Sequence, residues 1–106
     1  MKFEEPNPTG YTIYSKSGCV FCNKSKHDIN TKNIVPVIID CDEYLLDNKP
    51  AFLEFIKLKA EKDYRSFPMI FYNGQFVGGY VELKTHLQTH TQHVAAASSI
   101  SFSTEF

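Results

Sequence analysis

The sequence lacks an excess of charge of one sign. Its 106 residues carry 11 Lys and Arg side chains against 12 Asp and Glu side chains, which gives a formal net charge of −1. Nucleic acids and anionic membranes are bound chiefly through a basic excess, so we expect neither kind of partner. The chain also has no apolar run that approaches 18 residues, and we therefore expect no membrane-spanning helix.

Cysteine is scarce, and its number is odd. The three cysteines are Cys19, Cys22 and Cys41, a poor basis for a disulfide framework. The single Cys-x-x-Cys has no second pair that would complete a four-thiolate zinc site, so we expect no metal. The first six residues have no apolar signal-peptide core, which predicts a reducing cytoplasmic compartment.

The patterns that are present predict one small α/β domain in the order β-α-β-α-β-β-α. Pro36 places the second strand at a sheet edge because proline cannot donate a ladder hydrogen bond, and Asn73-Gly74 predicts a type I′ hairpin. Asn33 suits a left-handed position after the first helix. The expected strands are 11–14, 34–40, 69–72 and 75–78. The first expected helix runs from Cys19 to about Lys32. The second begins at a cap at Asp47 or Asn48, with Pro50 in its first turn, and the third begins after Gly79.

Apolar spacing predicts which side of each helix is buried. The first helix has a thin apolar face of Val20, Cys22, Ser25 and Ile29. The second has the clearest one, with Phe52, Phe55, Ile56 and Lys59 at i, i+3, i+4 and i+7, and the third carries Val81, Leu83 and Leu87. The stretch from about Ala95 is small and polar, so we assign the domain to residues 1–90 and a mobile C-terminal tail to residues 91–106.

The Cys-x-x-Cys follows a predicted strand and opens a predicted helix, which is typical of a redox dithiol. The helix N-terminus and the nearby charge of Lys16 both favour the Cys19 thiolate. Lowering a thiol pKa from about 8.5 to about 5 requires about 5 kcal/mol, whereas the helix dipole contributes only about 0.3–1 kcal/mol. We therefore expect direct hydrogen bonds from the N–H groups of Phe21 and Cys22, with Cys19 exposed and acidic and Cys22 more buried.

Three segments together resemble the glutaredoxins: Lys16-Ser17-Gly18-Cys19-Val20-Phe21-Cys22, Ser66-Phe67-Pro68 and Gly78-Gly79. The stretch from Gly78 to Leu83 is most similar to the small phage and viral members, and the resemblance covers about residues 11–87. It implies a thioredoxin-like fold with a four-stranded mixed sheet, strand order 2-1-3-4, and helices on both faces. It also implies a cis peptide bond between Phe67 and Pro68.

The resemblance further implies glutathione as co-substrate and a site that binds it. The backbone amides of Tyr80 and Val81 would take the γ-glutamyl carboxylate, and a basic residue near the second helix (Lys57, Lys59 or Arg65) would help at the other end. Many family members carry Ser or Asp where this chain has Val81, so one contact to glutathione is missing. The implied glutathione-binding residues are Lys16, Phe21, Phe67, Pro68, Gly79, Tyr80 and Val81.

The implied activity is thiol–disulfide exchange with Cys19 as nucleophile and Cys22 as resolving thiol. Expected partners are glutathione and disulfide-containing or glutathionylated proteins, ribonucleotide reductase being a family substrate, and the protein is expected to be a monomer. Two alternatives stay open. Val20 in place of proline leaves room for a 2Fe–2S cluster held by Cys19 and glutathione between two subunits, and Val81 favours a thioredoxin-like reductant fed by a flavoprotein reductase.

The remaining candidate residues have simpler interpretations. Cys41 follows the edge strand, and we interpret it as a structural or semi-exposed thiol, with regulatory oxidation as the lesser alternative. His86, His90 and His93 share one helical face at a spacing that could bind a metal, but without a fourth ligand we interpret them as a solvated helix end.

Overall fold

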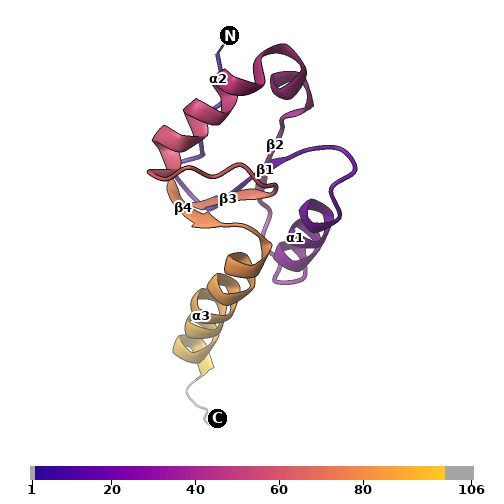
Figure 1. Cartoon of the computed structure of the whole chain (residues 1–106). Helices are drawn as coiled ribbons and strands as arrows, with labels where there is room; N and C mark the ends of the chain where they lie inside the picture. Colours follow the sequence, from indigo (N-terminus) through magenta and orange to yellow (C-terminus); the bar gives the residue numbers. More distant parts are fainter. Residues whose placement is uncertain (1, 100–106) are drawn as a thin grey trace.

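The computed structural model describes residues 2–99, and the side chains of residues 2–89 (Figure 1). Its four strands form one sheet in the order β2-β1-β3-β4. β1 pairs parallel with β2 and antiparallel with β3, and β4 pairs antiparallel with β3. The elements are β1 (Tyr11–Ser15), α1 (Val20–Asn30), β2 (Val37–Asp40), α2 (Asp42–Ala60), β3 (Met69–Tyr72), β4 (Gln75–Gly78) and α3 (Tyr80–Ser99).

The sheet separates two apolar clusters, because successive side chains of a strand point to opposite faces. On one face α2 packs through Phe52 and Ile56 onto side chains of β1, β2 and β3. On the other face Ile29 of α1 and Leu83 and Leu87 of α3 pack onto the opposite side of β1 and β3. The predicted mixed sheet with helices on both faces is therefore confirmed (Figure 1). Among residues 2–99, no helix has the length and apolar character needed to cross a bilayer.

Local signals positioned most of the turns correctly. Asn73 and Gly74 have φ values of 52° and 81°, as a type I′ hairpin requires. Asn33 has a φ of 61° just after α1, the left-handed conformation that asparagine tolerates. Both positions confirm the expectation from the sequence.

Two elements differ from the prediction. β2 begins only at Val37, since the donor-less Pro36 lies before the paired residues. α2 begins at Asp42, well before the predicted cap, and breaks at Asn48, whose φ of −160° is not helical. The Asn48 side chain then caps the second segment by accepting a bond from the Ala51 N–H at 3.2 Å, as predicted. The first segment was missed because it forms through the packing of Tyr44 and Leu45 on the core.

α3 continues to Ser99 and so includes the first part of the stretch that the sequence assigns to a tail. Residues 100–106 of that tail lie outside the described residues.

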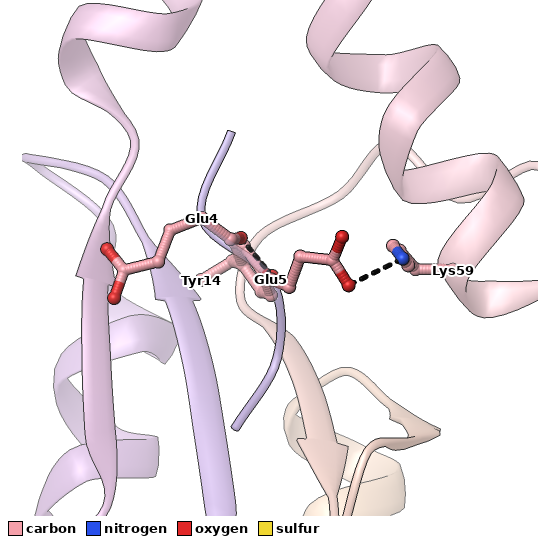
Figure 2. A network of polar contacts seen from close by, with 4 residues as sticks. All are labelled: Glu4, Glu5, Tyr14 and Lys59. Atoms are coloured by element: carbon pink, nitrogen blue, oxygen red, sulfur yellow. Dashed lines mark hydrogen bonds and ion pairs between the residues drawn. The ribbon is translucent and has the colours of Figure 1, made fainter. Parts of the chain in front are cut away.

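Residues 3–5 form an N-terminal strap across the α2 side of the sheet (Figure 2). The Tyr14 hydroxyl donates to the Glu4 carbonyl at 2.7 Å, and Lys59 forms an ion pair with Glu5 at 2.7 Å. The Phe3 ring lies 4.9–5.5 Å from the rings of three aromatic residues, namely Tyr44, Phe52 and Phe55. The strap thus packs against the core through Phe3.

Phe3→Ala is expected to destabilise the protein by about 1–3 kcal/mol, because Phe3 is half-buried and its ring fills space in the core. Glu5→Gln removes a largely exposed ion pair and should cost less than about 1 kcal/mol. Urea denaturation of the two variants compares these losses. An equal loss in both variants would mean that charge, not packing, holds the strap.

Candidate active site

The loop between β1 and α1 places Cys19 at the start of a helix. Gly18 adopts a φ of 71°, a left-handed conformation in which glycine has no Cβ penalty. Cys19 is the N-cap of α1, and its Sγ accepts a hydrogen bond from the Cys22 N–H at 3.1 Å. This is one of the two N–H contacts that the sequence predicts, and it supplies a donor that stabilises negative charge on sulfur.

Cys19 and Cys22 form a disulfide, with their Cα atoms 5.2 Å apart. Cys22 is completely buried, whereas Cys19 retains 9% of its surface exposed. Cys22 is more buried than Cys19, as predicted, but the prediction that Cys19 is exposed is wrong for this oxidised form. Its sulfur is bonded to the buried Cys22 and accepts the Cys22 N–H in the first turn of α1.

The peptide bond between Phe67 and Pro68 is cis, as the resemblance implies. The Lys16 ammonium lies 5.4 Å from the centroid of the Phe67 ring. Phe67 in turn stacks on Phe52 of α2, with ring centroids 6.3 Å apart and planes at 8°. The fold therefore brings Lys16 and Phe67 together and supports both from the core.

The N-terminal turns of α1 and α3 meet through an aromatic pair. The rings of Phe21 and Tyr80 stack with centroids 5.5 Å apart and an interplanar angle of 29°. The Tyr80 hydroxyl donates to Asp28 at 2.9 Å, which fixes the ring over α1. Val81 follows on the outer side of α3 and is exposed, although its spacing with Leu83 and Leu87 suggested a buried position.

The three basic residues considered as partners of a ligand carboxylate, Lys57, Lys59 and Arg65, have different surroundings in the structure. Lys59 is engaged by Glu5 of the strap. Arg65 pairs with Asp63 at 3.0 Å and lines, together with Lys57, a surface hollow of about 370 Å³. Lys57 and Arg65 thus stay candidates for a ligand carboxylate, and Lys59 has a structural role.

The glycine pair, Gly78 and Gly79, makes room for the side chains of Glu82 and Tyr64. The Glu82 carboxylate accepts a hydrogen bond from the Gly79 N–H at 2.9 Å, and a Cβ on Gly78 would lie 2.7 Å from the Cγ of Glu82. A Cβ on Gly79 would collide with the Tyr64 hydroxyl. The spacing from Gly79 to Glu82 is that of a capping box.

Asp42 is a further residue that sequence reasoning missed. Its carboxylate accepts the Ser17 N–H at 2.9 Å and also the Ser17 hydroxyl. These bonds, helped by the charge of Lys16, hold the pKa of Asp42 below its usual range. The start of α2 thereby clamps the loop that carries Cys19. No local motif signals this contact, because 25 residues separate the two partners.

Asp42→Ala is expected to slow thiol–disulfide exchange several-fold, because the loop before Cys19 loses two anchoring bonds, while Asp42→Asn should restore most of the rate by keeping an acceptor. A carboxyl whose pKa is lowered by folding stabilises the protein above its unfolded pKa, and this contribution is lost as the pH falls through the folded pKa. The stability difference between the wild type and Asp42→Asn should therefore shrink below about pH 4. Stopped-flow kinetics and urea denaturation at neutral and acidic pH measure both effects; equal rates for the two variants would contradict the clamp.

Of the two possibilities expected for Cys41, a structural or a semi-exposed thiol, the structure favours the first. It is fully buried, and burial raises the pKa of its thiol to about 12. A protonated, enclosed thiol is a poor nucleophile at neutral pH.

His86 is the member of the predicted histidine face whose side chain is described, and it has a structural contact. The Nδ1 atom of His86 lies 2.5 Å from the Tyr11 hydroxyl. The side chains of His90 and His93 lie outside the described residues. Within the described part of the chain, no three His, Cys, Asp or Glu side chains are grouped as metal ligands.

Comparison with known proteins independently supports the resemblance to the glutaredoxins. The glutaredoxin family model matches residues 11–77. The chain is 34% identical over 83 residues to Glutaredoxin-1 of Rhizophagus irregularis, covering 77% of this chain and 75% of that protein.

Solved structures show the same fold. Glutaredoxin 1 of Francisella tularensis, crystallised with cacodylate, has a TM-score of 0.67 at 24% identity and matches 76% of this chain and 93% of its own. A buckwheat glutaredoxin–glutathione complex has a TM-score of 0.66 at 17% identity and matches 86% of this chain and 80% of its own. Because the family model spans more than half of the chain and the fungal relative is similar over three quarters of its length, the chain belongs to the glutaredoxin family and is a thiol–disulfide oxidoreductase with a thioredoxin-like fold.

Proposed function

We propose that the protein uses glutathione to reduce protein disulfides and glutathione mixed disulfides, with Cys19 as nucleophile and Cys22 as resolving thiol. The observation that carries this assignment is the position of the Cys19 sulfur at the N-cap of α1, 3.1 Å from the Cys22 N–H. A thiolate at that position is favoured both by the donor and by the helix N-terminus. The completely buried Cys22 suits an internal attack better than an attack on an outside disulfide.

With a protein disulfide, the reaction proceeds in two exchanges. The Cys19 thiolate attacks one substrate sulfur, a mixed disulfide forms, and the other substrate sulfur leaves as a thiolate that takes up a proton. Cys22 then loses its proton and attacks the Cys19 sulfur, which releases the second substrate thiol and leaves Cys19 and Cys22 joined. Two glutathione molecules return the pair to dithiol and become one glutathione disulfide.

With a glutathione mixed disulfide, Cys22 is not needed. The Cys19 thiolate attacks the glutathione sulfur and releases the protein thiol. A second glutathione thiolate then attacks the glutathionylated Cys19, which regenerates its thiolate and forms glutathione disulfide. The protein-disulfide route therefore consumes two glutathione thiols and the mixed-disulfide route consumes one, and each route yields one glutathione disulfide.

Glutathione would lie along the face formed by the cis-proline turn and the two helix N-termini. The backbone of Phe67 would hold the glutathione peptide by strand-like pairing. Lys16, with Lys57 or Arg65, would bind the glycyl carboxylate. The backbone amides of Tyr80 and Val81 would bind the γ-glutamyl carboxylate. What supports this arrangement is the contact of Lys16 with Phe67 and of Phe21 with Tyr80 on either side of Cys19. The full proposed set is Lys16, Phe21, Phe67, Pro68, Gly79, Tyr80 and Val81.

A coupled assay tests the proposal. The protein is given a glutathionylated peptide with either glutathione, glutathione reductase and NADPH, or thioredoxin reductase and NADPH. We expect turnover in the first mixture and little in the second. The reverse result would make the protein a thioredoxin-like reductant, the alternative that Val81 favours. We further propose that it acts as a cytoplasmic monomer, and ribonucleotide reductase is the first protein substrate to try.

A further inference from the structure

Exposed apolar side chains gather around the disulfide. Of the seven large hydrophobic side chains that are exposed in the described part of the chain, three flank Cys19 or the neighbouring start of α3. Val20 is 63% exposed, Phe21 is 51% exposed and Val81 is 71% exposed. A cluster of exposed apolar groups beside a reactive centre indicates a surface that another molecule covers.

Two stacked rings with a lysine at each end form a row across this surface. The Lys24 ammonium lies 5.5 Å from the Phe21 ring centroid, Phe21 stacks on Tyr80, and the Lys84 ammonium lies 5.6 Å from the Tyr80 ring centroid. We call Lys24, Phe21, Tyr80 and Lys84 the lysine–aromatic row. Because the hydrogen bond from Tyr80 to Asp28 holds its centre, the row presents two ammonium groups at a defined spacing.

The positive and negative side chains around the lysine–aromatic row differ in their partners. Lys24 and Lys84 are exposed, and the two ion pairs found in the described residues lie elsewhere, at Glu5–Lys59 and Asp63–Arg65. The neighbouring carboxylates accept hydrogen bonds from this chain: Asp28 from Tyr80 and Glu82 from the Gly79 N–H. Both carboxylates therefore have a hydrogen-bond partner within the chain, while neither the Lys24 nor the Lys84 ammonium group forms an ion pair among the described residues.

We infer that the lysine–aromatic row, with Val20 and Val81, docks protein substrates whose reactive cysteine is flanked by an apolar residue and by carboxylate side chains. This inference rests on the proposed function and narrows its substrate class. Val20 and Phe21 follow Cys19 directly in the chain and are exposed, so they are available to a segment joined to Cys19 by a mixed disulfide. Its apolar side chain would cover Val20, Phe21 or Val81, and its carboxylates would reach Lys24 and Lys84.

The physical effect is on association and not on the exchange step. Complementary charge accelerates encounter and fixes orientation, and it is screened by salt. Burial of the exposed apolar groups would then hold the segment in place. A small disulfide without a polypeptide cannot make these contacts and should be indifferent to the row.

Two matched disulfide peptides test the inference. Both carry a leucine next to the cysteine, one with two flanking glutamates and the other with two flanking lysines, and kcat/KM is measured at low and high salt. We expect the acidic peptide to be preferred about tenfold at low salt, falling to about twofold in about 1 M salt. In the Lys24→Gln/Lys84→Gln double variant this preference should disappear, while the rate with hydroxyethyl disulfide stays within about twofold of the wild type.

The control is Lys32→Gln/Lys62→Gln, which removes the same charge from two exposed lysines outside the row. It should retain the preference for the acidic peptide. Equal rates for the two peptides in the wild type, or loss of the preference in the control as well as in the row variant, would overturn the inference. If hydroxyethyl disulfide is not reduced with glutathione at all, the proposed function itself fails, so the two failures are distinguishable.

Discussion

Cys19→Ser is expected to abolish turnover with both protein disulfides and glutathionylated peptides, with a loss on the order of 10³-fold or more. Both routes begin with attack by the Cys19 sulfur, and a serine hydroxyl is neither ionised at neutral pH nor able to form a disulfide. The coupled glutathione reductase assay measures the loss for each substrate. The variant should keep its fold, since the site is at a helix cap that serine also suits.

Cys22→Ser is the matched comparison. It leaves the attacking sulfur in place, so reduction of a glutathionylated peptide should persist while reduction of a protein disulfide falls sharply and a mixed disulfide accumulates. Mass spectrometry of the trapped species identifies the sulfur that holds the substrate. A covalent adduct on residue 22 of the wild type, or complete loss of deglutathionylation in Cys22→Ser, would reverse the two roles.

Phe52→Ala is expected to cost about 3–5 kcal/mol of unfolding free energy, a large part of the about 5–15 kcal/mol that holds a typical domain. Phe52 is fully buried. Its ring is within 5.4–6.4 Å of the centroids of five other aromatic rings: Phe3, Tyr14, Tyr44, Phe55 and Phe67. Removing it leaves a cavity where the strap, β1, α2 and the cis-proline turn meet.

Phe52→Leu fills most of that cavity and should cost only about 1–2 kcal/mol. Urea denaturation followed by circular dichroism gives both values. Phe52→Ala should also weaken the site, because Phe67 loses the ring on which it stacks. A loss below about 1 kcal/mol for the alanine variant would show that the aromatic cluster contributes little to stability.

Short-range sequence signals accounted for much of the fold. Asn73-Gly74 predicted the hairpin and Asn33 the left-handed residue after α1, because each conformation depends on the φ values that one or two residues tolerate. The second half of α2 was found through its cap at Asn48 and the spacing of Phe52 and Ile56. These features extend over a few neighbouring residues, so one sequence contains all that is needed to recognise them.

The first half of α2 and the exposure of Val20 and Val81 were not predicted. Spacing placed both valines on apolar helix faces, but in the first turns of α1 and α3 their side chains are exposed. In the same way, the periodicity of residues 42–47 is too short to predict a helix, and it took packing of Tyr44 and Leu45 on the core to make one.

The sequence alone determined the order of the elements, the edge position of the second strand and the dithiol at the start of a helix, since each follows from local backbone preference or from the spacing of two cysteines. Only the tertiary structure decided that Asp42 clamps Ser17 across 25 residues, that Lys59 is bound by Glu5 across 54, and that Cys19 is largely buried. Such contacts join side chains from separate elements, and their formation depends on how the helices pack against the sheet, which no local pattern specifies.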